Sequence, residues 1–307
     1  MALTSTAWAS AASAAPGSHG GGGGGSTTVT TGNDVSYPQC GSTLPSATAF
    51  GIVGVNGGLA DTPNNCLGIA DGLSSSELYW ALTTANGSTS QPTASLYVNT
   101  ADPGNVYNGT PITDWPTSGN TPYGTCTTTT VTLSSGTTMV GENSPACAWQ
   151  YGWNMATQDA VWLTAAATAI DALKPPTTAP TSPGAYPWWL DVETANTWQS
   201  GSTGIEMNVA DLQGMVSALQ HAGVTTTAPY VVGAYSTSYQ WGQIAGNTDS
   251  PSLYNGVSNN LYGIPDWIPG ARSSSGAQSN CSLPTFTGGT VTVTQWFAHP
   301  VDGDVAC

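Results

Sequence analysis

Two carboxylates stand two residues apart at the end of a predicted buried strand, in residues 188–193 (WWLDVE). Side chains at positions i and i+2 of a strand point to the same side, so Asp191 and Glu193 face the same way. Cleavage of a glycosidic bond needs an acid that protonates the leaving oxygen and a second carboxylate that stabilises positive charge on the sugar. The pattern indicates a sugar-cleaving site, with Glu193, the longer and outer of the two, as general acid.

On its own the Asp-x-Glu triplet is a weak signal, because such triplets occur by chance and acids at strand ends often cap turns. Other acids in this chain strengthen it. Asp34 lies on another predicted strand, and Asp302 and Asp304 follow the last predicted strand. In a chain with only 17 Asp and Glu residues, this placement favours a single acidic site. Asp302 and Asp304 compete for its last position, and motif spacing favours Asp302.

The composition limits the kinds of partner that the protein can bind. Lys174 and Arg272 are the only basic side chains apart from histidine, and the formal net charge is -15, so the chain has no cationic surface for nucleic acid or anionic lipid. Charged residues make up 6% of the chain, where about 25% is usual. Few groups change charge in acid, which limits self-repulsion there. We hypothesise that the protein works in an acidic extracellular medium.

Six cysteines and no Cys-x-x-Cys pair favour disulfides over metal ligation. Six cysteines allow 15 pairings, and our preferred set joins nearest neighbours: Cys40 with Cys66, Cys126 with Cys147, and Cys281 with Cys307. The three histidines are far apart in the sequence, and neither a Gly-x-Ser-x-Gly elbow nor a phosphate loop is present. We therefore expect no metal site and no cofactor.

Three segments are expected along the chain. Residues 1–15 are a remnant of a signal peptide or an Ala-rich tail, and residues 16–28 are a Gly-rich flexible linker. Residues 29–307 form the folded domain, in which residues 105–147 are a disulfide-stapled surface insertion. No run reaches the roughly 18 apolar residues of a membrane span. We expect a secreted protein, extracellular or at the cell surface, without membrane insertion, and a monomer.

Short apolar runs alternate with helical patterns over most of this domain, as in βα units around a parallel sheet. Helical patterns open near residues 74, 153 and 208, and they disappear after about residue 247. The fold class is therefore α/β, an irregular TIM-type (β/α) barrel with a helix-poor C-terminal part. The seven expected strands are residues 34–37, 51–56, 95–99, 188–192, 230–235, 263–268 and 291–296.

Twelve tryptophans against three phenylalanines favour a sugar-binding surface, because indole faces stack on pyranose rings. The candidates for this role, near strand ends, are Trp188, Trp198, Trp241, Trp267 and Trp296. The alternative is that each packs in the core. Trp188 and Trp189 alternate along one strand, so one of them should face the helices.

The chain resembles glycoside hydrolase family 25 lysozymes at short motifs in matching order. These are Asp34-Val35-Ser36, the Trp189–Glu193 stretch (WLDVE), Tyr235-Ser236-Thr237, and Gln295-Trp296 followed by Asp302. The resemblance implies a secreted muramidase with an irregular barrel of eight strands and about five helices, which cleaves the bond between N-acetylmuramic acid and N-acetylglucosamine with retention.

By the same resemblance, Glu193 is the acid/base, Asp191 supports the substrate acetamido group or the transition-state charge, and Asp34 and Asp302 line the floor. Tyr235 and Gln295 are expected in the pocket, and Tyr37, Trp267 and Trp296 complete the predicted substrate-binding residues. The chain departs from the family at residues 54–58 (GVNGG) and 98–100 (VNT), where the family carries charged or aromatic residues. The identity of the glycan therefore stays open.

Two functions follow from these residues. The first is a secreted glycoside hydrolase acting on peptidoglycan or a related amino-sugar polymer. The second is a non-catalytic cell-wall or glycan-binding surface protein on the same barrel. In both, the partner is a glycan polymer of a cell wall.

Overall fold

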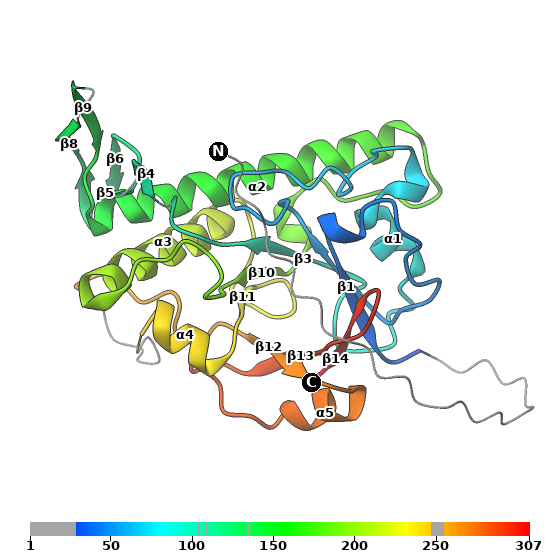
Figure 1. The fold of residues 1–307 in the computed structure, drawn as a ribbon. Coiled ribbons are helices and arrows are strands. Elements are labelled where there is room, and N and C mark those ends of the chain that lie inside the picture. Colours follow the sequence, from blue (N-terminus) through cyan, green and yellow to red (C-terminus); the bar gives the residue numbers. More distant parts are fainter. Residues whose placement is uncertain (1–28, 104, 108–109, 114, 134–135, 247–254) are drawn as a thin grey trace, which may run out of the picture.

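The computed structural model describes residues 29–103, 105–107, 110–113, 115–133, 136–246 and 255–307, so the expected signal-peptide remnant and Gly-rich linker lie outside the described residues. Its centre is a closed barrel of eight strands (Figure 1). The strands in barrel order are β1 (Gly32–Val35), β14 (Asp302–Ala306), β13 (Val291–Trp296), β12 (Asp266–Ala271), β11 (Val232–Tyr235), β10 (Trp188–Asp191), β3 (Ala94–Asn99) and β2 (Gly51–Gly54).

The barrel is parallel except at one strand. β1, β2, β3, β10, β11, β12 and β13 pair in parallel, and β14 pairs antiparallel with both β13 and β1. Parallel strands have their carboxyl ends at the same mouth of a barrel. The residues that end these strands therefore surround one opening.

Helices connect the parallel strands and cover the outside of the barrel (Figure 1). α2 and α3 are the longest of those described. The helices are α1 (Glu77–Thr84), α2 (Pro145–Ala172), α3 (Gly201–His221), α4 (Ser238–Ile244) and α5 (Ser274–Asn280). The prediction of an irregular α/β barrel with a helix-poor C-terminal part is confirmed, since α4 and α5 have 7 residues each.

Two elements differ from the expectation. α5 is made of small polar residues with no apolar periodicity, and it is capped by the Ser273 side chain, which accepts a hydrogen bond from Gly276 N. α3 begins seven residues before the expected start at Asn208. Asn208 lies inside the helix because its side chain is used elsewhere, donating to the carbonyl oxygens of Gln199 and Ile244 at 2.9 Å each.

β14 was not among the seven expected strands, because its sequence, Asp-Gly-Asp-Val-Ala, has the composition of a turn. The glycine in its second position is required by packing. A Cβ placed on Gly303 would lie 2.0 Å from the ring of Trp296 on the neighbouring strand. The close approach of β14 to the Trp296 ring of β13 thus explains why a glycine, which is unfavourable in strands, occupies position 303.

Successive side chains of a strand point to opposite faces, so the barrel strands contribute to two separate hydrophobic cores. Trp188, Leu190 and Val192 belong to the larger cluster between the barrel and the helices. Trp189 belongs to a second cluster inside the barrel, with Phe50, Ile52, Trp267 and Val293. The expectation that one tryptophan of the pair faces the helices is confirmed, and it is Trp188.

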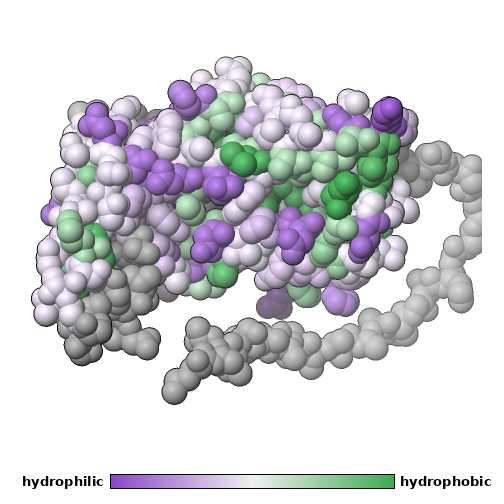
Figure 2. All heavy atoms as spheres, turned by 90° about the horizontal axis from the view of Figure 1, so that it is seen from above, coloured by the Kyte–Doolittle hydropathy of each residue, from purple (hydrophilic) through white to green (hydrophobic). Residues whose placement is uncertain are grey.

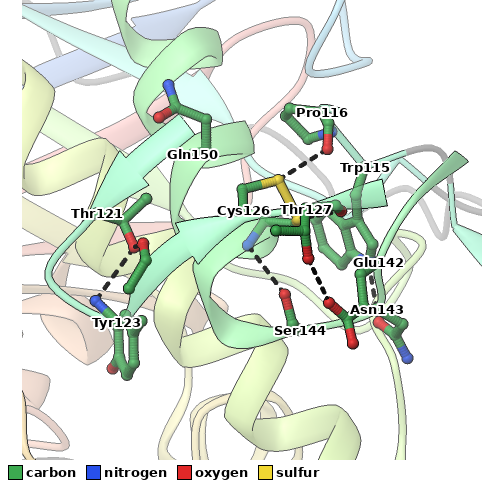
Figure 3. The surroundings of a disulfide bond; sticks show 12 residues. Trp115, Pro116, Thr121, Tyr123, Cys126, Thr127, Glu142, Asn143, Ser144 and Gln150 are labelled. Carbon is green, nitrogen blue, oxygen red and sulfur yellow. Dashed lines mark hydrogen bonds between the residues drawn. A yellow bond between two sulfur atoms is a disulfide. The ribbon is translucent and has the colours of Figure 1, made fainter. Parts of the chain in front are cut away.

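Residues between β3 and α2 form three two-stranded antiparallel sheets outside the barrel. Figure 1 shows β8 (Thr128–Leu133) and β9 (Gly136–Gly141) projecting beyond the amino-terminal end of α2. The other four strands are β4 (Asn105–Tyr107), β5 (Thr110–Thr113), β6 (Gly119–Thr121) and β7 (Gly124–Cys126). The disulfide from Cys126 to Cys147 joins this region to the first turn of α2 (Figure 3).

All three disulfides are those of the preferred nearest-neighbour set: Cys40 with Cys66, Cys126 with Cys147, and Cys281 with Cys307. They span 26, 21 and 26 residues of sequence, respectively. Each bridge restricts the unfolded chain, which by loop-closure entropy contributes roughly 3 kcal/mol or more per bridge.

Figure 2 shows the face covered by α2, where residues of intermediate hydropathy dominate and strongly hydrophilic ones are scattered. None of the helices in the described part of the chain has the length and hydrophobicity needed to cross a membrane.

α2 and α3 pack closely because a glycine faces the contact. A Cβ on Gly152 would lie 2.0 Å from the backbone oxygen of Asp211 and 2.5 Å from its side-chain Oδ1. Backbone cannot move aside as a flexible side chain does, so any larger residue at this position forces the two helices apart.

We expect Gly152→Ala to destabilise the protein by about 1–3 kcal/mol, the usual range for overpacking. Gly242→Ala is the matched control, because Gly242 lies in α4 with open space around its Cβ position. There alanine should be neutral or stabilising by up to ~1 kcal/mol, from helix propensity. Urea unfolding of the oxidised proteins measures both; equal effects at the two sites would contradict this packing role.

Candidate active site

The carboxyl-end mouth of the barrel is surrounded by a layer of polar and aromatic side chains. Neighbouring strands place Asn99, Asp191, Tyr235 and Trp267 at successive paired positions on β3, β10, β11 and β12. On the other side, β13 and β14 pair Gln295 with Asp304, and β14 and β1 pair Asp302 with Asp34. The strands thus bring the predicted acids to one end of the lumen.

One chain of hydrogen bonds crosses the lumen. The Tyr235 hydroxyl donates to Gln295 Oε1 at 2.9 Å, and Gln295 Nε2 donates to Asp34 Oδ2 at 2.9 Å. This fixes which side of the Gln295 amide faces which neighbour. Burial raises the pKa of Asp34 to about 6, against the lowering effect of the Gln295 hydrogen bond, and Asp302 adds to the rise.

Asp304 lies below Asp34 and is fully buried. Its Oδ1 accepts a hydrogen bond from Trp267 Nε1 at 3.0 Å, and its carboxyl hydrogen-bonds Asp34. Burial first, and then the charge of Asp34, raise the pKa of Asp304 well above its usual range. Two carboxyl groups can bond to each other only through a proton, so Asp304 is protonated and donates to Asp34.

Asp302 and Asp304 were competing candidates, and the structure places both near Asp34. Asp302 is half-buried and lies nearer the mouth, where its Oδ1 accepts a hydrogen bond from Ala298 N at 2.8 Å. Burial raises its pKa. The favoured residue, Asp302, holds the loop between β13 and β14, while Asp304 makes the direct contact with Asp34.

Asp191 ends β10 and is 7% exposed. Asn99 Nδ2 donates to its Oδ2 at 3.5 Å, while its Oδ1 has no hydrogen-bond partner among the described residues. Burial raises the pKa of Asp191 well above its usual range, and the charges of Glu193 and Asp34 add to the rise.

Glu193 lies two residues farther out and is half-buried, so a ligand entering the mouth can reach it. Gln240, in the first turns of α4, places its Nε2 3.5 Å from Glu193 Oε1. The Glu193 carbonyl accepts a hydrogen bond from Trp198 Nε1 at 3.1 Å. The acid therefore stands at the entrance with its backbone held by the loop that follows it.

The predicted aromatic residues differ in position. Trp267 is buried at the base of the lumen, with edge contacts to Tyr97, Trp189 and Tyr235 at ring distances of 6.1, 5.8 and 4.5 Å. Trp296 faces away from Gln295, toward Ala271 and Val305.

Tyr37 differs from both tryptophans, being 50% exposed in the turn after β1. The structure therefore brings Tyr37 and Trp267 to the mouth and floor of the site, and leaves Trp296 outside it.

Sequence reasoning did not assign roles to Asn99, Tyr97 or Gln240. Asn99 and Tyr97 could have been found from alternation along β3, since they occupy the same face as the acids of neighbouring strands. The turn between β11 and α4 brings Gln240 to Glu193, and no periodicity in the sequence predicts this turn.

No basic side chain in the described part of the chain neutralises these acids. Lys174 and Arg272 are both exposed, and neither contributes to the pKa of any acid in the site. Within the described ranges, no group of three His, Cys, Asp or Glu residues is arranged to hold a metal ion. Protons and hydrogen bonds, rather than basic side chains, therefore stabilise the acids of the site.

Comparisons with known proteins place this chain in no family. No model of a known protein family matches it, and no curated protein matches it. Among solved structures, a muramidase from Trichobolus zukalii is similar to it, with a TM-score of 0.43 and 13% sequence identity over 91% of this chain and 94% of that chain.

The raised carboxyl pKa values predict that the protein is most stable in acid. Besides the site acids, burial raises the pKa of Glu77 to about 7 and that of Asp266 to about 6. A carboxyl whose pKa is higher in the folded than in the unfolded chain favours folding below the unfolded value, about 4, and this advantage is lost as pH rises through the folded value.

Melting temperatures measured from pH 3 to 8 should therefore be highest at about pH 4 or below and fall steadily as pH rises from about 4 to 8. Glu77→Gln should flatten the curve, since it removes one titrating group while keeping the shape of the side chain. A melting temperature that drops as pH falls from 6 to 4 would contradict the prediction.

Proposed function

We propose that this protein is a secreted glycoside hydrolase of the muramidase type, acting on peptidoglycan or a related amino-sugar polymer. The observation that supports it most is the position of Glu193, a reachable acid at the mouth of a barrel whose floor holds Asp34, Asp191 and Asp304. Three disulfides are typical of proteins from oxidising, extracellular compartments.

In this proposal Glu193 protonates the glycosidic oxygen. A general acid must first be within reach of the leaving group, and only then does its pKa matter. Glu193 meets the first condition better than Asp191, which is buried behind it. The leaving group departs with the proton, and Glu193, now a carboxylate, can remove a proton from the attacking water in the second half of the reaction.

Asp191 acts on the sugar beside the cleaved bond. Its Oδ1 is buried and has no protein donor in the described part of the chain, so a substrate amide that reaches it would supply the missing hydrogen bond. An acetamido N–H donating to Asp191 would be oriented for attack of its carbonyl oxygen on the anomeric carbon. This supports an N-acetylated sugar as the substrate.

Asp34 and Asp302 line the floor and mouth, where their carboxyl oxygens, and above about pH 6 the negative charge of Asp34, stabilise the positive charge that develops on the sugar ring. Gln295 and Tyr235 keep Asp34 in place through their hydrogen bonds. Tyr37 offers an exposed ring at the rim on which a second sugar unit can stack.

Glu193→Gln should reduce the release of reducing ends from purified peptidoglycan by at least about 10³-fold, in line with the loss of a general acid at a site of this kind. Release would be measured at pH 4, 5.5 and 7 with the oxidised protein. Glu142→Gln is the matched control. Glu142 is exposed outside the barrel and accepts a hydrogen bond from Thr127 that glutamine can also accept.

Binding to insoluble peptidoglycan would be measured on the same samples. Release by the parent and by Glu142→Gln but not by Glu193→Gln, with binding retained in all three, supports the hydrolase. Binding by all three with no release from any would contradict it and favour the alternative, a non-catalytic cell-wall or glycan-binding protein.

A further inference from the structure

The loop of residues 193–200 folds back onto the residue that begins it. Asn196 N and Trp198 Nε1 both donate to the Glu193 carbonyl oxygen, at 3.2 and 3.1 Å. Asn196 Nδ2 donates to Thr100 O at 2.8 Å, which joins the loop to the end of β3. The shape of this loop therefore determines the position of Glu193.

The other end of the loop is attached to Asp102. Thr197 Oγ1 donates to the Asp102 carbonyl oxygen, and Gln199 N donates to Asp102 Oδ2 at 3.3 Å. Gln199 N also donates to Asn208 Oδ1 at 3.1 Å. Asp102 thus holds two successive parts of the loop, one through its backbone and one through its carboxyl group.

The carboxyl group of Asp102 faces that of Asp211 on α3. Each residue is 1% exposed, and their side chains hydrogen-bond one another. Asp102 Oδ1 and both oxygens of Asp211 find no donor among the other described side chains. A carboxyl–carboxyl hydrogen bond needs a proton, so the pair holds at least one.

The titratable groups around the pair are acidic or neutral. Tyr151 on α2 is close enough for the charges of Asp211 and Asp102 to raise its pKa. The charges of Asp159 on α2 and of Asp61 in the loop after β2 raise the pKa of Tyr151 as well. No lysine, arginine or histidine contributes to the pKa of either member. Gly152 lets Asp211 lie directly against α2, which excludes water from this side. No group among the described residues compensates for a second negative charge.

We propose that Asp102 and Asp211 are positioning residues for Glu193, and that the proton they share holds the 193–200 loop in its working shape. Losing that proton leaves two buried carboxylates in contact. Their repulsion separates α3 from Asp102 and releases the loop. The pair thereby sets the upper pH limit of the site. The link to catalysis rests on the proposed function, whereas the link between the proton and the loop does not.

The surroundings of Asp102 and Asp211 agree with a loop that is held in acid and released at higher pH. Burial raises the pKa of Asp102 to about 7, against hydrogen bonds from Gln199, and burial together with Asp102 raises the pKa of Asp211 well above its usual range. Because the two groups interact, the proton is lost from the pair rather than from one residue. The loop is therefore held in acid and is loosened as the shared proton is lost, at the higher pH set by the raised pKa of Asp211.

Hydrogen exchange of the Asn196 and Gln199 amides, corrected for intrinsic rates, tests the loop directly at pH 5 and pH 8. In the parent, protection should be lower at pH 8 than at pH 5, by a factor that grows about tenfold for each pH unit above the pKa of the shared proton. In Asp211→Asn the amide donates to Asp102 without a shared proton, so protection should change less than twofold. Asp159→Asn is the control, because Asp159 is a fully buried acid of α2 whose carboxyl group makes no hydrogen bond to the loop.

The alkaline limb of kcat/KM is the second measurement. It should move to higher pH in Asp211→Asn and stay in place in Asp159→Asn, which a merely structural role of Asp211 would not produce. Asp102→Asn, the mirror variant, replaces Asp211→Asn if the latter does not fold. Equal protection of the parent amides at pH 5 and 8, or failure of both amide variants to fold at pH 5, would overturn the proposal.

The two proposals fail separately. If no variant and no parent sample releases reducing ends, the hydrolase is contradicted, while the exchange measurement still decides whether the proton holds the loop. If release is observed and the exchange is independent of pH, the hydrolase stands without this positioning pair.

Discussion

Burial of carboxyl groups without neighbouring cations is the constraint on which this structure depends. Asp159, Asp191, Asp211 and Asp304 are buried, each with at least one carboxyl oxygen that has no donor among the described residues. An isolated carboxylate is strongly unfavourable in such surroundings, so these groups fold with their protons. The acids are thus neutral polar groups, able to donate as well as accept hydrogen bonds.

This constraint connects the surface, the core and the site. The surface has few charges to lose in acid, and the core and the barrel floor are stabilised by protons that acid supplies. The same conditions reduce the net charge of -15, which lowers repulsion between the protein and an acidic polymer. Stability, the approach of the proposed substrate and the protonated barrel floor all favour acidic surroundings, in agreement with the hypothesis drawn from the composition.

The sequence predicted the parallel strands and the position of most acids well, because alternation and strand ends are local signals. It also predicted the three disulfides. It missed β14, where Gly303 reflects a contact with a ring 7 residues away in sequence rather than any strand propensity. It missed Asp304 as the partner of Asp34 and Asp211 as the partner of Asp102. The spacing of residues in a sequence does not predict contacts between acids on distant elements.

The protonation state of the barrel floor can be measured directly by carbon-13 NMR titration of the side-chain carboxyls. The structure predicts that Asp34 titrates at about pH 6 and that Asp191 and Asp304 keep their protons to higher pH. Titration of all three near the ordinary aspartate value of about 4 would contradict the account, because the floor would then hold carboxylates that nothing in the described structure neutralises.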